Sequence, residues 1–89
     1  MRNSTYVKNH IISIKNFAKE RGYKVEYIPS DVDFYFIVYK RKFFGLYNEF
    51  VKKFYGCWDG RKYKFDNVWD DVRKFIMYKT ENEYYKKYN

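Results

Sequence analysis

Near the start of the chain, apolar residues recur at the spacing of a helix that buries one side. These positions are Val7, Ile11, Ile14 and Ala18. Ser4 or Thr5 can cap the start of such a helix, and Gly22 suits the left-handed residue that commonly follows its end. We therefore expect a first helix that ends just before Gly22.

The next two segments have the patterns of strands. From residue 23 to residue 28, Tyr23, Val25 and Tyr27 alternate with polar positions, which indicates a half-buried strand. Pro29-Ser30-Asp31 is typical of a turn. From Asp33 to Arg41 the chain is apolar on both faces, which favours a second strand in the interior of a sheet.

After the second strand the pattern changes. Lys40-Arg41-Lys42 is either a turn or a hairpin tip that leads into a short third strand around Phe43 and Phe44. A stripe at helical spacing follows and consists of Leu46, Phe50, Phe54 and Trp58. This stripe predicts a second helix over residues 46–57.

The last part of the chain predicts more helix. Asp66 or Asn67 can cap a helix from Val68 to about Tyr78. Thr80 with Glu83 resembles a capping box for a short last helical turn over residues 81–88. The expected core under the sheet consists of Phe50, Phe54, Trp58, Val68, Val72 and Ile76.

These elements define an α+β fold in the order α-β-β-(β)-α-α, with a small antiparallel sheet packed against helices. Its 89 residues form a single domain, 1–89. A lone cysteine excludes an intramolecular disulfide. Residues 1–8 are polar and no apolar run of a signal peptide follows them, and the longest apolar run, 34–39, is too short to span a bilayer. We expect a cytoplasmic protein that does not contact membranes.

The residues do not favour an enzyme. His10, the only histidine, falls on the helical side of Ile14 and Phe17, which indicates a partly buried packing residue. Cys57, beside Trp58, is interpreted as a small packing residue. The close carboxylate pairs, Asp31 with Asp33 and Asp70 with Asp71, lack a third acid or lysine placed for metal-dependent nuclease chemistry. We expect no catalytic residue, cofactor, metal or small-molecule substrate.

The charge balance points to a macromolecular partner. Nineteen Lys and Arg against 11 Asp and Glu give a net charge of +8, which suits RNA, DNA or an acidic protein groove. The composition also includes 12 Tyr, 9 Phe and 2 Trp. Cations beside exposed rings are typical of single-stranded nucleic-acid binding and also of protein hot spots. A solvated basic face without a partner, or a genome rich in A+T codons, would give a similar composition.

Two basic loops are the expected partner-binding site, because each combines cations with a ring and loops often carry binding residues. The first is the hairpin tip and the second precedes the third helix. Their residues are Lys40, Arg41, Lys42, Phe43, Arg61, Lys62, Tyr63 and Lys64. We expect these two loops to lie on neighbouring edges.

The α-β-β-β-α order is similar to that of the double-stranded-RNA-binding domain. The basic start of the final helix in that domain has no counterpart here, where Leu46-Tyr47-Asn48-Glu49 stands. Another resemblance is carried by residues 49–58 (EFVKKFYGCW), 68–72 (VWDDV) and 9–16 (NHIISIKN). These segments resemble small phage-encoded anti-CRISPR proteins that inhibit type II CRISPR nucleases.

That resemblance implies a fold of α-β-β-β-α-α order and a phage or mobile-element inhibitor of a host defence nuclease. The protein it resembles is acidic and imitates DNA phosphates, whereas this chain is basic at Lys40-Arg41-Lys42 and at Arg61-Lys62-Tyr63-Lys64. The expected partner is therefore a host CRISPR effector or its guide-RNA complex, bound by another mechanism. The alternative is a basic nucleic-acid-binding accessory protein without inhibitory role.

Overall fold

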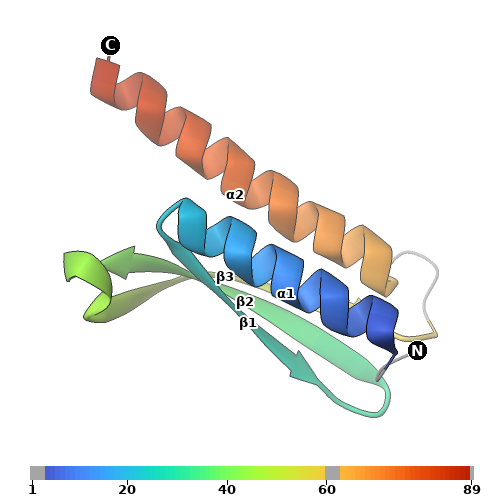
Figure 1. Cartoon of the computed structure of the whole chain (residues 1–89). Helices are drawn as coiled ribbons and strands as arrows, with labels where there is room; N and C mark the ends of the chain where they lie inside the picture. The colour runs from blue at the N-terminus through green and yellow to red at the C-terminus, as the bar shows by residue number, and fades with distance from the viewer. Residues whose placement is uncertain (1–3, 60–62, 89) are drawn as a thin grey trace.

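The computed structural model describes residues 4–59 and 63–88, with side chains through Asn82. Three strands follow one another in the chain, with one helix before them and one after them (Figure 1). The elements are α1 (Thr5–Glu20), β1 (Tyr23–Pro29), β2 (Asp33–Lys42), the 3-10 turn η1 (Phe43–Gly45), β3 (Tyr47–Cys57) and α2 (Phe65–Tyr88).

The strands form one antiparallel sheet in the order β1-β2-β3. Both helices pack on the same face of this sheet (Figure 1). The expected α+β class, with a small antiparallel sheet packed against helices, is confirmed. The opposite face of the sheet is not covered by any helix in the part of the chain that the structure describes.

Helix α1 begins and ends as its sequence indicates. The Ser4 hydroxyl accepts a hydrogen bond from the Val7 backbone N–H at 3.2 Å, which identifies Ser4 as the cap. Gly22 has a φ of +80°, the left-handed conformation that glycine adopts without steric cost. Val7, Ile14 and Ala18 are buried against the sheet, as their spacing predicts.

The core lies between the helices and the inner face of the sheet. Strand β2 contributes Phe34, Phe36 and Val38, each fully buried. The other buried apolar residues come from α1, β1 and α2 and are Val7, Ile14, Ala18, Tyr23, Val25, Phe65, Val68, Val72 and Ile76. Of the six expected core residues, Val68, Val72 and Ile76 are buried, and Phe54 and Trp58 pack partly buried against the core. Phe50 is 59% exposed, so its assignment to the core was wrong.

The helix expected over residues 46–57 is a strand instead. Val38 pairs with Lys52 and Tyr39 with Phe50, so Val51 is an extra residue at a β-bulge. The extra residue shifts the alternation by one position and places apolar residues at a spacing that imitates a helix. Strand β2 pairs with β1 along one edge, and β3 pairs with the unsatisfied backbone groups of its other edge. The third strand is therefore Tyr47–Cys57, whereas Phe43 and Phe44 lie in the turn η1.

The last helix is continuous from Phe65 to Tyr88 and includes both helical segments expected there. The Thr80 hydroxyl donates to the backbone carbonyls of Ile76 at 3.0 Å and Met77 at 2.9 Å. A hydroxyl bonded back to the preceding turn lies within a helix. Thr80 therefore does not cap a new helix, and the expected break after Tyr78 was wrong.

Candidate nucleic-acid interface

The first expected loop lies at one end of the sheet. Lys40, Arg41 and Lys42 are the last residues of β2, and Phe43 opens the turn η1. The ammonium of Lys42 lies 3.1 Å from a carboxylate oxygen of Glu49, across the hairpin. The ammonium of Lys40 lies 4.6 Å from the centre of the Tyr23 ring. These contacts hold the cations along the hairpin end.

The second expected loop lies at the other end of β3. Lys42 pairs with Tyr47 at the hairpin end, whereas Cys57 pairs with Asp33 and its backbone N–H donates to the Tyr63 carbonyl at 2.9 Å. The whole length of β3 therefore separates the two loops, and their expected position on neighbouring edges was wrong. A helix in place of β3 would have brought them closer. Tyr63 and Lys64 are exposed, whereas Arg61 and Lys62 lie outside the described residues.

The uncovered face of the sheet carries a row of aromatic rings that sequence reasoning missed. Tyr35 on β2 lies opposite Tyr55 on β3, with their ring centres 5.6 Å apart. Tyr39 lies opposite Phe50, with the ring centres 6.3 Å apart. Tyr63 extends the row beyond the end of β3, with its ring centre 6.0 Å from that of Tyr55. We call these five residues the aromatic row.

A lysine lies within the aromatic row. Lys53 pairs with Ile37 between the two aromatic pairs, and its ammonium lies 4.1 Å from the centre of the Tyr35 ring. At this distance the cation is attracted by the ring face. The row therefore combines aromatic rings with a positive charge beside them.

Two tyrosines of the row, Tyr39 and Tyr55, have raised pKa values. Partial burial raises the pKa of Tyr39, and the charge of Glu26, which accepts a hydrogen bond from its hydroxyl at 3.4 Å, raises it further. Burial also raises the pKa of Tyr55, with smaller contributions from Cys57 and Asp33. Both phenols therefore stay neutral near neutral pH and do not repel a phosphate.

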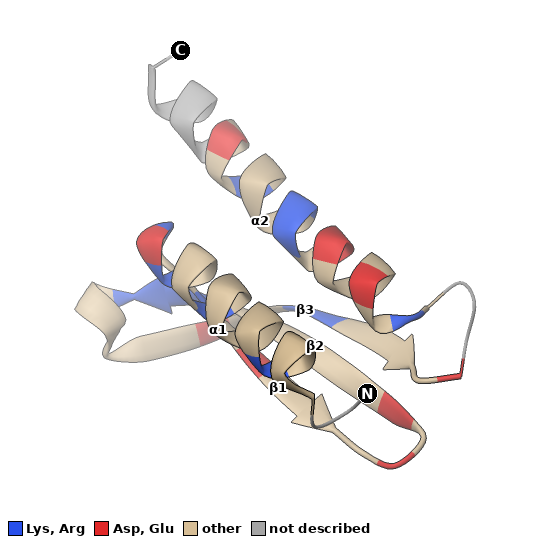
Figure 2. Ribbon diagram, turned by 45° about the vertical axis from the view of Figure 1, so that its right-hand side comes forward, with Lys and Arg blue, Asp and Glu red and all other residues tan. Residues whose placement is uncertain are grey.

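Charge is unevenly distributed along the sheet. Figure 2 shows Lys and Arg segments at the β2–β3 hairpin end and Asp and Glu segments at the β1–β2 turn. The turn carries Asp31 and Asp33, and Asp59 follows β3 at the same end. A polyanion is therefore attracted to the hairpin end.

The turn η1 exposes large apolar side chains. Phe43 is 71% exposed, Phe44 is fully exposed and Leu46 is 90% exposed. Phe43 and Phe44 have positive φ values of 55° and 59°, which bulky residues rarely adopt. We call Phe43, Phe44 and Leu46 the apolar tip. Of these three residues, sequence reasoning placed only Phe43 in the candidate site, because Phe43 directly follows the basic residues 40–42.

The single histidine packs against aromatic rings. The His10 ring lies 5.1 Å from Trp69 and 6.0 Å from Phe65, centre to centre, and its Nδ1 lies 2.9 Å from the Tyr6 carbonyl oxygen. It is half-buried, as its helical position indicates. Cys57 is half-buried at the end of β3. Among the described residues no cluster of three His, Cys, Asp or Glu side chains is placed to hold a metal ion.

No protein-family model matches the chain, and no significant similarity to a curated protein or to a solved structure is found. None of the helices described has a stretch apolar and long enough to span a bilayer. The resemblance to anti-CRISPR proteins therefore rests on three sequence segments. Residues 9–16 and 68–72 are helical, as the resemblance implies, whereas residues 49–58 form a strand and its continuation in place of the implied helix.

Proposed function

We propose that this protein binds single-stranded nucleic acid on the open face of its sheet, in the cytoplasm of a host cell. The observation that carries this proposal is the aromatic row with Lys53 above the Tyr35 ring. Bases of any sequence stack on such rings, and each stacked base contributes about 1–3 kcal/mol. The net charge of +8 supplies the general attraction for phosphates.

Single strands suit this face better than a duplex does. Double-stranded RNA is bound largely through its 2′-hydroxyls and phosphates, and contacts to phosphates favour cations. Here the last helix begins at Phe65 and carries Asp66 in its first turn, followed by Asp70 and Asp71. These carboxylates would repel phosphates. A duplex also keeps its base faces stacked and offers none to Tyr35 or Tyr55.

The test measures the binding of a short labelled oligonucleotide, as DNA and as RNA, by fluorescence anisotropy. We expect Tyr35→Ala and Tyr55→Ala each to weaken binding about tenfold, because each loses one stacked base. Tyr78→Ala is the matched control, because Tyr78 is an exposed tyrosine on α2 and does not belong to the aromatic row. Equal losses in all three variants, or no binding of the wild type at low salt, would overturn the proposal.

A second candidate function is inhibition of a host defence nuclease, with a CRISPR effector or its guide-RNA complex as the partner. The apolar tip favours this candidate, because exposed aromatic anchors beside cations are typical of protein hot spots. Strain at Phe43 and Phe44 that does not serve packing within the chain is consistent with a role in contacts to a partner. The resemblance to anti-CRISPR proteins supports the same candidate.

The two candidate functions differ in whether binding to the partner depends on nucleic acid. A protein-directed inhibitor binds its purified effector in a fixed ratio after nuclease treatment, and replacing Phe44 by Ser abolishes that binding. A nucleic-acid binder loses its partner on nuclease treatment and keeps its affinity for oligonucleotides when Phe44 is replaced. A pull-down with the wild type and with Phe44→Ser, each with and without nuclease treatment, separates the two functions.

A further inference from the structure

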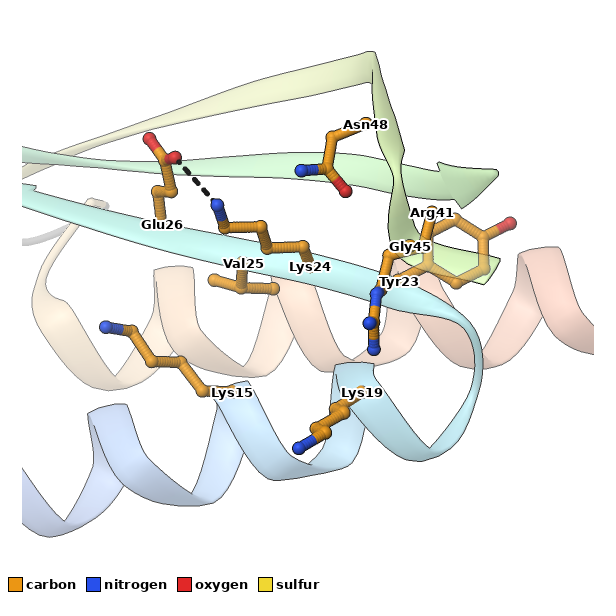
Figure 3. A pocket seen from close by; sticks show the side chains of 9 residues that line it. All are labelled: Lys15, Lys19, Tyr23, Lys24, Val25, Glu26, Arg41, Gly45 and Asn48. Carbon is orange, nitrogen blue, oxygen red and sulfur yellow. Dashed lines mark ion pairs between the residues drawn. The ribbon is translucent and has the colours of Figure 1, made fainter. Parts of the chain in front are cut away.

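A pocket of about 580 Å³ lies beside the hairpin end, between α1, β1 and the end of β2 (Figure 3). Four cations from three elements line it. Lys15 and Lys19 lie one turn apart on α1, Lys24 lies on β1 and Arg41 on β2, and the side chain of Arg41 extends toward α1 (Figure 3). Lys15 and Lys19 lie on the α1 side of β1, whereas Lys24 is directed toward Glu26 on the other side of this strand (Figure 3). Cations from separate elements therefore gather around this edge of the sheet, unlike a charged face of a single helix.

Only one carboxylate among the lining residues opposes these cations. It belongs to Glu26, whose carboxylate lies 3.5 Å from the Lys24 ammonium and also accepts the hydrogen bond from Tyr39. In the part of the chain that the structure describes, no ion pair is found for Lys15, Lys19 or Arg41. Their charges therefore remain available to a ligand.

The backbone leaves room for the Arg41 side chain in this pocket. The Arg41 backbone N–H donates to the Gly22 carbonyl at 3.0 Å, which fixes the strand end against the end of α1. Gly45 has a φ of +89°, and a Cβ built on it would lie 2.6 Å from the Nη2 atom of Arg41. The absence of a side chain at Gly45 thus leaves the space that the guanidinium occupies. A guanidinium in this position suits bidentate contact with phosphate oxygens.

The pocket adjoins the aromatic row. Lys24 pairs with Tyr39 across β1 and β2, and Tyr39 is the ring of the row closest to the hairpin end on β2. Asn48 of β3 also lines the pocket, two residues before Phe50 of the row. A nucleic-acid strand whose bases stack on Tyr39 and Phe50 therefore reaches the cations of the pocket at the hairpin end of the row.

We propose that the pocket binds a phosphate monoester, namely the terminal phosphate of the single strand that lies on the aromatic row. The part of this inference that concerns the nucleic-acid strand rests on the proposed function. The binding of a phosphate monoester in the pocket does not depend on it. A monoester is a dianion with three free oxygens near neutral pH, whereas an internal phosphodiester is a monoanion with two. Several cations around one pocket suit the monoester better.

The test compares one oligonucleotide in three forms, with a 5′-phosphate, with a 3′-phosphate and with hydroxyls at both ends. We expect one phosphorylated form to bind at least about tenfold tighter than the unphosphorylated form, because charge-assisted hydrogen bonds to the extra oxygens are gained. The ratio of the two affinities is the readout, and it falls to about one in Lys15→Gln/Lys19→Gln. Lys8→Gln/Lys79→Gln removes the same charge outside the pocket and keeps the ratio.

A nucleoside monophosphate, added as competitor and as a direct ligand, separates this inference from the proposed function. If all three oligonucleotides bind equally well, the pocket assignment is overturned and the aromatic row stands. If the monophosphate binds in a manner that depends on Lys15 and Lys19 while no oligonucleotide binds, the phosphate site stands and the proposed function fails. If neither ligand binds, or if the control double variant also loses the ratio, the phosphate site is overturned. Arg41→Gln repeats the test with a residue from a different element.

Discussion

Gly56 faces Phe34 across the β2–β3 ladder, and the Phe34 ring occupies the space that a side chain at position 56 would need. A Cβ built on Gly56 would lie 2.0 Å from the Cζ atom of Phe34. Phe34 is fully buried, with its ring centre 4.7 Å from that of Trp58 and 5.6 Å from that of Phe65. The ring therefore has little freedom to move aside.

We expect Gly56→Ala to destabilise the fold by about 1–3 kcal/mol, the usual cost of overpacking a core. In a strand without such a contact, alanine is more stable than glycine. A loss of stability in Gly56→Ala therefore supports the close approach of the Phe34 ring to position 56, and a gain contradicts it. Urea unfolding measures it. Phe34→Leu in the Gly56→Ala background should recover part of the loss, and a double-mutant cycle without coupling between the two positions would contradict the contact.

Phe54 and Phe50 test whether residues 47–57 form a strand. In the strand, Phe54 packs on the inner face, with its ring centre 5.6 Å from that of Phe75 on α2, whereas Phe50 lies on the open face. We expect Phe54→Ala to cost about 2–3 kcal/mol and Phe50→Ala less than about 1 kcal/mol. In the helix expected from spacing, both residues share one buried stripe and both substitutions would be costly. Chemical denaturation of the two variants decides between strand and helix.

The sequence was sufficient for α1 and β1 because each has one clear periodicity, and for β2 because its continuous apolar run favours an interior strand. The 3.6-residue period of Val7, Ile14 and Ala18 and the alternation of Tyr23 with Val25 both agree with the burial observed. Strand β3 has no such period, because the bulge at Val51 places its apolar residues out of step. Local pattern and tertiary pairing disagree there, and tertiary pairing with β2 prevails.

The candidate site could be predicted only in part for the same reason. The cations at 40–42 and the ring of Phe43 were found because basic residues beside aromatic residues are visible in the sequence. The aromatic row was not found, because Tyr35 and Tyr55 become neighbours only through the register of β2 with β3. The strain at Phe44 has no sequence signal, since phenylalanine is not a residue that favours positive φ.

The pH dependence of stability should include a contribution from Asp70. The Lys74 ammonium lies 2.9 Å from its carboxylate, and this hydrogen bond, with the nearby charges of Lys74 and Arg73, lowers the pKa of Asp70 below its ordinary value of 3.8. The folded state therefore favours the charged carboxylate. The contribution is fully present above the unfolded pKa and is lost as the pH falls through the lower folded pKa.

We expect Asp70→Asn to be slightly less stable than wild type at pH 7 and equal to it in strong acid. The pKa of Lys74 is raised by the same pair, so Lys74 stays charged over this range. Thermal unfolding over a series of pH values measures the difference. Asp71→Asn removes a charge at the neighbouring helix position and is the control, and an identical pH profile for both variants would show that the pair with Lys74 has no separate effect.

The cations of the hairpin end should appear in the salt dependence of binding. If Lys40 and Arg41 contact two phosphates of a single strand, Lys40→Gln/Arg41→Gln should lower the slope of log affinity against log salt by about 1.4. Lys8→Gln/Lys79→Gln changes the net charge equally at positions outside the hairpin and should leave the slope nearly unchanged. Anisotropy titrations between about 50 and 200 mM salt measure both slopes. Equal slopes for the two variants would place the phosphate contacts elsewhere on the molecule.

Phe44 combines a strained backbone with a side chain that is fully exposed, so its folded-state cost is not offset by packing. With a φ of 59° and a ψ of 31° it lies in the left-handed region, which costs a residue with a Cβ about 1–2 kcal/mol. Phe44→Gly relieves this strain but adds disorder to the unfolded chain. We expect a net gain of about 0.5–1 kcal/mol in the free energy of unfolding.

Leu46→Gly is the matched control, because Leu46 is also exposed but has an ordinary right-handed conformation, with a φ of −72°. Glycine relieves no backbone strain at position 46 and only adds conformational freedom to the unfolded chain. Leu46→Gly should therefore lose stability by roughly the amount that Phe44→Gly gains. If the apolar tip binds a partner protein, Phe44→Gly should be more stable than wild type and yet fail to capture that partner. A loss of stability in Phe44→Gly would show that its ring packs within the chain, and the tip would then be a structural element with no need of a partner.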